Sequence, residues 1–208
     1  EVIKVEKPGS GDGARSLGPF FGDDPHPEKS LLFFYLNDNK KSITLNLKTE
    51  KGKRILKELV KDADVLVENF EPRVMPSLGL SYETLREINP RLIMTSISNF
   101  GQTGPYRDYK AQDIVAYALG GYLYMTGSYE REPVKHGLNQ AQMLAGLNGA
   151  VGTLTALASQ RSSGVGQQVD VSIQETVNPA LFFFGMGYTW NGAIWRRQPK
   201  GGFIYIGG

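Results

Sequence analysis

The feature that most constrains this chain is a regular alternation of short apolar runs with segments of helical periodicity. Runs rich in Val, Ile and Leu predict strands at residues 2–6, 42–47, 64–69, 91–98 and 168–173. Between and after them, helical patterns predict helices at residues 50–62, 82–88, 113–119, 140–161 and 175–186. Such alternation is typical of an α/β fold with a mainly parallel sheet flanked by helices.

Capping residues support two of these helices. Thr49 and Ser81 each stand directly before a helical pattern, where their hydroxyl groups can accept a hydrogen bond from a free backbone N–H. Asn89 precedes Pro90, and a residue before proline disfavours helical backbone angles. We therefore expect the second helix to end at Ile88.

Composition excludes several functional classes. The 208 residues are 40% hydrophobic and 21% charged, which is typical of a folded globular chain. The net charge of +2, with both signs interleaved, argues against a nucleic-acid partner. The chain has no cysteine, which excludes thiolate nucleophiles and cysteine-based zinc sites, and its two histidines argue against a histidine-rich metal site.

The ends and the most apolar segment bear on where the protein works. Both ends show strand patterns, at residues 1–6 and 203–206, so we expect the middle of a longer protein. The segment 143–158 is too short to span a bilayer and contains Asn148, which predicts a buried helix and no membrane association. Nothing in the sequence indicates export, so we expect a cytoplasmic location.

Ligands of parallel sheets bind beyond the carboxyl ends of the strands, which directs attention to the loops at residues 7–13, 47–49, 69–73 and 99–110. The first loop has the glycine spacing GxGxG and not the GxGxxG of a dinucleotide site, so it favours a flexible loop. Lys48 stands at a strand-to-helix junction, where a cation suits an anionic ligand. His136 is isolated, and we interpret it as a surface or hydrogen-bonded residue and not as a catalytic base.

A series of collinear strings resembles the class III CoA-transferases, the family of formyl-CoA and carnitine CoA-transferases and α-methylacyl-CoA racemase. The strings cover almost the whole chain and comprise VIKVEKPGSGD (2–12), NKKSITL (39–45), ADVLVENF (63–70), LGL (78–80), INPRLI (88–93), SNFGQTGPYRD (98–108) and GVGQ (164–167).

This resemblance implies a Rossmann-like large domain, a smaller second domain and two chains that interlock like rings. Residues 1–190 would form the central part of the large domain and residues 191–208 the start of a linker. The chain would then lack the N-terminal segment and most of the small domain. The substrate would be coenzyme A as an acyl thioester, exchanged with a carboxylic acid, without a permanently bound cofactor.

The resemblance also implies which residues contact CoA or its acyl end. The residues at family contact positions are Lys7, Leu45, Asn46, Leu47, Lys48, Asn69, Phe70, Glu71, Lys110 and Asp113. The family often has an Arg before the glycine that matches Gly79, whereas this chain has Leu78 there. Arg73, one helical turn away, is a candidate replacement.

The catalytic position departs from the family pattern. The resemblance implies an Asp that attacks the acyl thioester, forms a mixed anhydride and later carries CoA as a thioester. Counting back from Gly164 and forward from Gly127 both place this position at Gln142. A neutral amide cannot form the anhydride, so Gln142 is predicted to be inactive. The racemase reaction is disfavoured because its bases correspond to Gln112 and Gln142, which do not titrate.

Three functions therefore compete. The chain could be a subunit without the nucleophile in a heteromeric CoA-transferase, with an Asp-bearing sister chain. It could be an active transferase that uses another carboxylate, namely Asp113, Glu130 or Glu132. It could also be an acyl-CoA-binding protein that does not turn over. The sequence names neither the acyl group nor the acceptor acid, and it leaves homodimer and heterodimer open.

Overall fold

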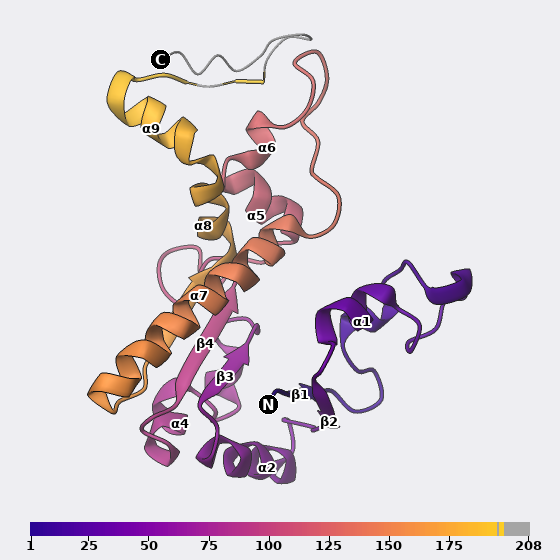
Figure 1. The fold of residues 1–208 in the computed structure, drawn as a ribbon, viewed down its shortest axis with the longest axis vertical. Coiled ribbons are helices and arrows are strands. Elements are labelled where there is room, and N and C mark those ends of the chain that lie inside the picture. Colours follow the sequence, from indigo (N-terminus) through magenta and orange to yellow (C-terminus); the bar gives the residue numbers. More distant parts are fainter. Residues whose placement is uncertain (195, 198–208) are drawn as a thin grey trace. The chain divides into compact units, whose positions relative to one another are not determined.

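The computed structural model describes residues 1–194, 196 and 197. The chain divides into two compact parts, which we call the N-terminal unit (Glu1–Lys61) and the C-terminal unit (from Asp62 onward) (Figure 1). Each unit contains its own parallel sheet, so the predicted α/β class is confirmed. The strand pattern at residues 203–206 lies outside the described residues, as does most of the predicted linker, and the proposed domain boundary stays a prediction.

The N-terminal unit is built on two parallel strands. Strand β1 (Ile3–Glu6) pairs with β2 (Lys41–Thr44), and Glu6 lies opposite Thr44. Its helices are α1 (Leu31–Asn37), α2 (Glu50–Lys61) and the 3-10 turns η1 (Gly13–Ser16) and η2 (Phe21–Asp23). Helix α1 was not predicted, although Ser30 caps it by accepting a hydrogen bond from the Phe33 N–H.

The C-terminal unit contains three parallel strands in the order β3 (Val65–Glu68), β4 (Ile93–Ser98) and β5 (Gln168–Ser172). Glu68 is opposite Ser96, and Ser98 is opposite Ser172. The carboxyl ends of all three strands therefore meet at one edge of the sheet. The central strand β4 is buried at five of its six residues, as expected for a parallel sheet covered by helices.

The helices of this unit largely match the predicted pattern. They are α3 (Val74–Ser77), α4 (Tyr82–Ile88), α5 (Asp113–Leu119), α6 (Tyr122–Met125), α7 (Gln140–Ser163), α8 (Ile173–Val177) and α9 (Phe182–Asn191), with the 3-10 turn η3 (Asn178–Leu181). The prediction of one helix over residues 175–186 is wrong. Pro179 has no N–H to donate, and α8 ends two residues before it.

Helix α7 packs on β4 and β5 through small residues (Figure 1). A Cβ added at Gly149 would lie 3.1 Å from Ile97 Cδ1, and one at Gly152 would lie 2.8 Å from Val169 Cγ1. The opposite face is exposed at Leu147, Val151 and Leu154. The predicted buried helix is therefore buried on one face only. No helix within the described residues has the length and apolar character needed to cross a bilayer.

Candidate functional site

A cavity of about 450 Å³ opens in the C-terminal unit at the carboxyl ends of the strands. Its walls come from residues 69–73 after β3, residues 97–99 at the end of β4, and Ile173 after β5. The loop at residues 107–109 and the first turns of α7, at Gln142 and Gly146, complete the wall. This is the place where a parallel sheet binds its ligands.

The structure brings five of the predicted site residues together. Asn69, Phe70, Glu71, Arg73 and Gln142 all line this cavity. Two further predicted residues of the same unit do not line it: Lys110 is exposed directly after the lining residue Tyr109, and Asp113 is buried behind the start of α7. The remaining five predicted residues belong to the N-terminal unit.

The turn after β3 is fixed by a buried carboxylate. Glu68 is 8% exposed, and its Oε2 accepts a hydrogen bond from the Phe70 N–H at 2.8 Å. Burial raises the pKa of Glu68, against the opposing effect of hydrogen bonds from Ser96 and the Phe70 backbone. The Glu68 hydrogen bond holds the backbone of Asn69 and Phe70 at the cavity wall.

The start of α7 is anchored by Asp113. Its Oδ1 accepts a hydrogen bond from the Gln142 N–H at 3.1 Å, and its Oδ2 lies 3.2 Å from Lys135 Nζ. Asp113 therefore satisfies one of the free N–H groups of the first turn of the helix. The Gln142 side chain is exposed at the cavity, and its Oε1 accepts a hydrogen bond from Asn139 Nδ2 at 3.2 Å.

Two charged side chains pair across the cavity mouth. Arg73 donates from Nε and Nη2 to the two oxygens of Asp108, at 2.7 and 2.6 Å. The bidentate hydrogen bonds from Arg73 lower the pKa of Asp108 to about 2, so this carboxylate is ionised across the physiological range. The guanidinium of Arg73, a predicted CoA-binding group, is thus fixed in orientation by Asp108 of the loop at residues 99–110.

The five predicted residues of the N-terminal unit cluster at the carboxyl ends of its two strands. Lys7 follows β1, and the Leu45 N–H donates to the Glu6 carbonyl at 3.0 Å. The Lys48 N–H donates to Asn46 Oδ1 at 3.1 Å, which shapes the loop with Leu47 before α2. Of these residues, Lys7, Asn46 and Lys48 are exposed and available to a ligand.

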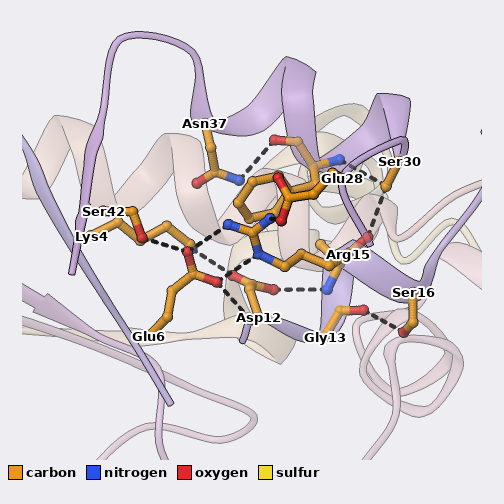
Figure 2. Close-up of polar contacts among 12 residues, drawn as sticks. Lys4, Glu6, Asp12, Gly13, Arg15, Ser16, Glu28, Ser30, Asn37 and Ser42 are labelled. Atoms are coloured by element: carbon orange, nitrogen blue, oxygen red, sulfur yellow. Dashed lines mark hydrogen bonds and ion pairs between the residues drawn. The ribbon is translucent and has the colours of Figure 1, made fainter. Parts of the chain in front are cut away.

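A buried ion pair behind this cluster was not predicted from the sequence. Glu6 is 5% exposed and accepts hydrogen bonds from Arg15 at 2.8 and 2.9 Å, from Ser42 at 2.8 Å and from the Asp12 N–H at 2.8 Å (Figure 2). The hydrogen bonds from Arg15 lower the pKa of Glu6 to about 2 although burial opposes this. The network fixes the loop that begins at Lys7.

Several cavity residues were also missed by the residue-level prediction. Arg107, Asp108 and Tyr109 line the cavity, although the sequence had marked their whole loop, 99–110, as a ligand loop. Loop position alone did not show which side chains face the cavity. Within the described residues, no group of three or more His, Cys, Asp or Glu side chains could hold a metal ion.

Comparisons with known proteins agree with the fold. A model described as CoA-transferase family III matches residues 1–203. The acetyl-CoA:oxalate CoA-transferase of Acetobacter aceti is 43% identical over 173 residues, which cover 83% of this chain and 43% of that protein. The succinyl-CoA–L-malate CoA-transferase beta subunit of Chloroflexus aurantiacus is 40% identical over 178 residues, covering 85% of this chain and 43% of that protein.

A solved structure extends the similarity to three dimensions. A CaiB/BaiF family protein from Brucella suis superposes with a TM-score of 0.87 at 35% identity, over 95% of this chain and 52% of that chain. The chain thus spans about half the length of these relatives. The resemblance expected from the sequence is confirmed, and the chain belongs to CoA-transferase family III.

Proposed function

We propose that this protein takes part in moving CoA between an acyl-CoA and a carboxylic acid, as the subunit without the nucleophile in a heteromeric CoA-transferase. The observation that carries the proposal is the position of Gln142, which lines the cavity at the start of α7. An uncharged amide at that position can contact an acyl thioester, but it cannot attack it and form an anhydride.

The other candidate nucleophiles lie less favourably. Asp113 is buried and does not line the cavity; its Oδ1 accepts a hydrogen bond from the Gln142 N–H, and its Oδ2 makes no hydrogen bond but forms an ion pair with Lys135. Glu130 and Glu132 are exposed between α6 and α7 and do not line the cavity. These positions argue against Asp113, Glu130 or Glu132 as the nucleophile.

Two carboxylates do line the cavity, Glu71 and Asp108. Asp108 is a weak nucleophile because Arg73 binds both of its oxygens and keeps its pKa low. Glu71 is exposed, and we assign it to CoA contact as the sequence predicts. It is the residue to substitute as a control if the wild-type chain turns over alone.

CoA binding is assigned to the predicted residues of each unit. In the N-terminal unit, Lys7 and Lys48 are exposed cations at strand ends, which suits the phosphates of CoA. In the C-terminal unit, Arg73 supplies a further cation in the cavity wall with Asn69 and Phe70, and Lys110 supplies an exposed one after the lining residue Tyr109. We propose CoA as a substrate that enters and leaves, not as a resident cofactor.

The proposed partner is an Asp-bearing sister chain in an interlocked dimer. A pseudo-symmetric heterodimer differs from a homodimer by few substitutions, so loss of the nucleophile from one chain is tolerable when the sister chain retains it. The Chloroflexus aurantiacus relative is by its name a beta subunit. This name supports a heteromeric arrangement as the first one to test.

The test is CoA transfer by the full-length chain alone, with succinyl-CoA and a panel of carboxylic acids. Wild type is compared with Gln142→Asp and with Gln142→Asn, which has the shape of Asp without its charge. We expect transfer only from the Asp variant, together with a covalent CoA adduct at residue 142 detected by mass spectrometry. A carboxylate at this third position of α7 is also favoured by the helix dipole.

Each outcome separates the competing functions. If wild type transfers CoA by itself, the proposal is wrong, and Glu71→Gln and Asp113→Asn then identify the working carboxylate. If wild type and both variants are inactive yet bind CoA, the chain is an acyl-CoA-binding protein. Co-purification of wild type with an Asp-bearing family member would complete the support for a heteromer.

A further inference from the structure

The cavity of the C-terminal unit contains a second arginine, Arg107, whose buried Nε makes no hydrogen bond and whose nearest carboxylate, Asp108, is already bound by Arg73. Arg73 takes both oxygens of Asp108 in bidentate hydrogen bonds at 2.7 and 2.6 Å. Arg107, the neighbour of Asp108 in the chain, is left with a 3.5 Å approach of its Nε to Asp108 Oδ1. This approach is too long for a strong charge-assisted hydrogen bond.

The Arg107 guanidinium lies where a ligand in the cavity could accept a hydrogen bond from it. Its Nε is buried and donates no hydrogen bond to any described residue, while its side chain is 40% exposed and lines the cavity. A guanidinium remains charged at any physiological pH and has five N–H donors. A buried Nε–H without an acceptor is costly, so the group favours a ligand that brings an oxygen acceptor.

The two carboxylates that line the cavity do not prevent an anion from binding beside Arg107. Asp108 is neutralised by Arg73, and the other lining carboxylate, Glu71, is exposed to solvent. Water screens the exposed Glu71 more strongly than it screens a partly buried guanidinium. Apolar walls at Phe70 and Ile173 lower the local dielectric, which strengthens the attraction of an oxyanion to Arg107.

We propose that Arg107 is a specificity-determining residue that binds a substrate oxyanion in this cavity. The oxyanion is either the second carboxylate of a dicarboxylic acceptor or a phosphate of CoA, and both groups match the planar donor set of the guanidinium. The proposal rests on the proposed CoA-transfer function for the identity of its substrates. Its observable, however, is direct binding, which requires no turnover.

The experiment is isothermal titration calorimetry of the full-length chain with four probes in two matched pairs. Succinate and butyrate have the same number of carbon atoms and differ in the second carboxylate, whereas CoA and pantetheine differ in the phosphates. Wild type is compared with Arg107→Met, Arg107→Lys and the control Arg86→Met, which removes an equal charge from α4, outside the cavity. Thermal unfolding of each variant verifies that the fold is retained.

We expect Arg107→Met to weaken binding of one charged probe by about 10- to 100-fold. Its uncharged counterpart and the Arg86→Met control should change less than about twofold, and Arg107→Lys should recover part of the loss. A loss confined to succinate identifies the carboxylate of the acceptor, and a loss confined to CoA identifies a phosphate.

Equal binding of all probes by wild type and Arg107→Met overturns the inference, as does the absence of succinate and CoA binding to wild type. The proposed function fails separately. If Gln142→Asp gains no transfer while Arg107→Met still loses succinate or CoA binding, the anion site stands and the CoA-transfer role does not. If Gln142→Asp is active and binding is insensitive to Arg107, only the anion site is lost.

Discussion

At the scale of single residues, a carboxylate paired with an arginine fixes a loop in each unit: Glu6 in the N-terminal unit and Asp108 at the cavity of the C-terminal unit. Glu6 and Asp108 each accept bidentate hydrogen bonds from an arginine, yet only Glu6 is buried. The exposed Arg73–Asp108 pair contributes little to stability because water screens it, and its effect is to orient Arg73. Breaking the buried Glu6–Arg15 pair should cost more, because removal of one partner leaves the other largely buried charge without its counter-charge.

Replacing Glu6 with Gln tests this difference. We expect Glu6→Gln to lower the free energy of unfolding by about 2 kcal/mol at neutral pH, because hydrogen bonds to charged groups are lost in a buried setting. Glu28→Gln removes a second partner of Arg15. The Glu28 side chain is 73% exposed, so this change should cost no more than about 0.5 kcal/mol. Urea unfolding of the three proteins measures both changes.

The Glu6 effect should also depend on pH. The pKa of Glu6 is about 2 in the folded chain against an ordinary value of 4.5, so below pH 4.5 the unfolded chain binds more protons. The contribution of Glu6 is therefore fully present above pH 4.5 and is lost as the pH falls through about 2. The difference between wild type and Glu6→Gln should shrink over this window. A constant difference down to pH about 2 would contradict the assignment.

At the scale of elements, the contact between α5 and the first turn of α7 fixes the position of residue 142. Residue 142 lines the cavity because its backbone N–H is fixed by Asp113, the first residue of α5. Lys135, in the segment before α7, lies against the same carboxylate. The buried core of Ala116, Tyr117, Ala141 and Ala145 joins α5 to α7 behind this contact. Asp113 is therefore a positioning residue in this structure.

Substitution of Asp113 tests whether its carboxylate positions the start of α7. Asp113→Ala removes the acceptor of the Gln142 N–H and should lower the free energy of unfolding by about 1 to 2 kcal/mol. Amides in the first turn of α7 should then exchange faster with solvent in hydrogen-exchange mass spectrometry. Asp113→Asn retains an acceptor oxygen and should lose clearly less. If the two variants exchange equally fast, the Lys135 ion pair and not the hydrogen bond anchors the helix.

At the scale of the whole molecule, the two units differ in how much core they contain. The buried residues of the N-terminal unit are Glu6, Ser30, Gly52, Leu56 and Val60. The C-terminal unit buries many large apolar side chains, among them Leu80, Leu85, Leu92, Ile93 and Met94. A two-stranded sheet with few buried apolar residues is only marginally stable by itself.

This difference predicts unequal protection of the two sheets. Amides of β1 and β2 should exchange with solvent about tenfold faster or more than those of β3, β4 and β5, because local opening requires less free energy where fewer apolar contacts break. Hydrogen-exchange mass spectrometry of the full-length chain measures this directly. Adding CoA should slow exchange at residues 45–48 if the predicted contacts form. Equal protection of both sheets would contradict the prediction.

The sequence determined those features that depend on local pattern. Alternating apolar runs predicted the five strands, and Ser81 and the Asn89–Pro90 pair marked the ends of α4 correctly. The predicted parallel sheet implied that ligands bind at the carboxyl ends of the strands, and the cavity lies there. Pro179 is a local signal for the break between α8 and α9, because proline has no N–H to continue a helix.

Only the tertiary structure decided which side chains meet. Asp113 and the Gln142 N–H are 29 positions apart in the chain, and Arg73 and Asp108 are 35 apart. Periodicity and capping report on neighbours within a turn or a strand, and they contain no information on pairs joined by packing of distant elements. The sequence therefore predicted Gln142 at the family's nucleophile position, whereas the hydrogen bond from the Gln142 N–H to Asp113 and the unsatisfied Nε of Arg107 became visible only in the folded chain.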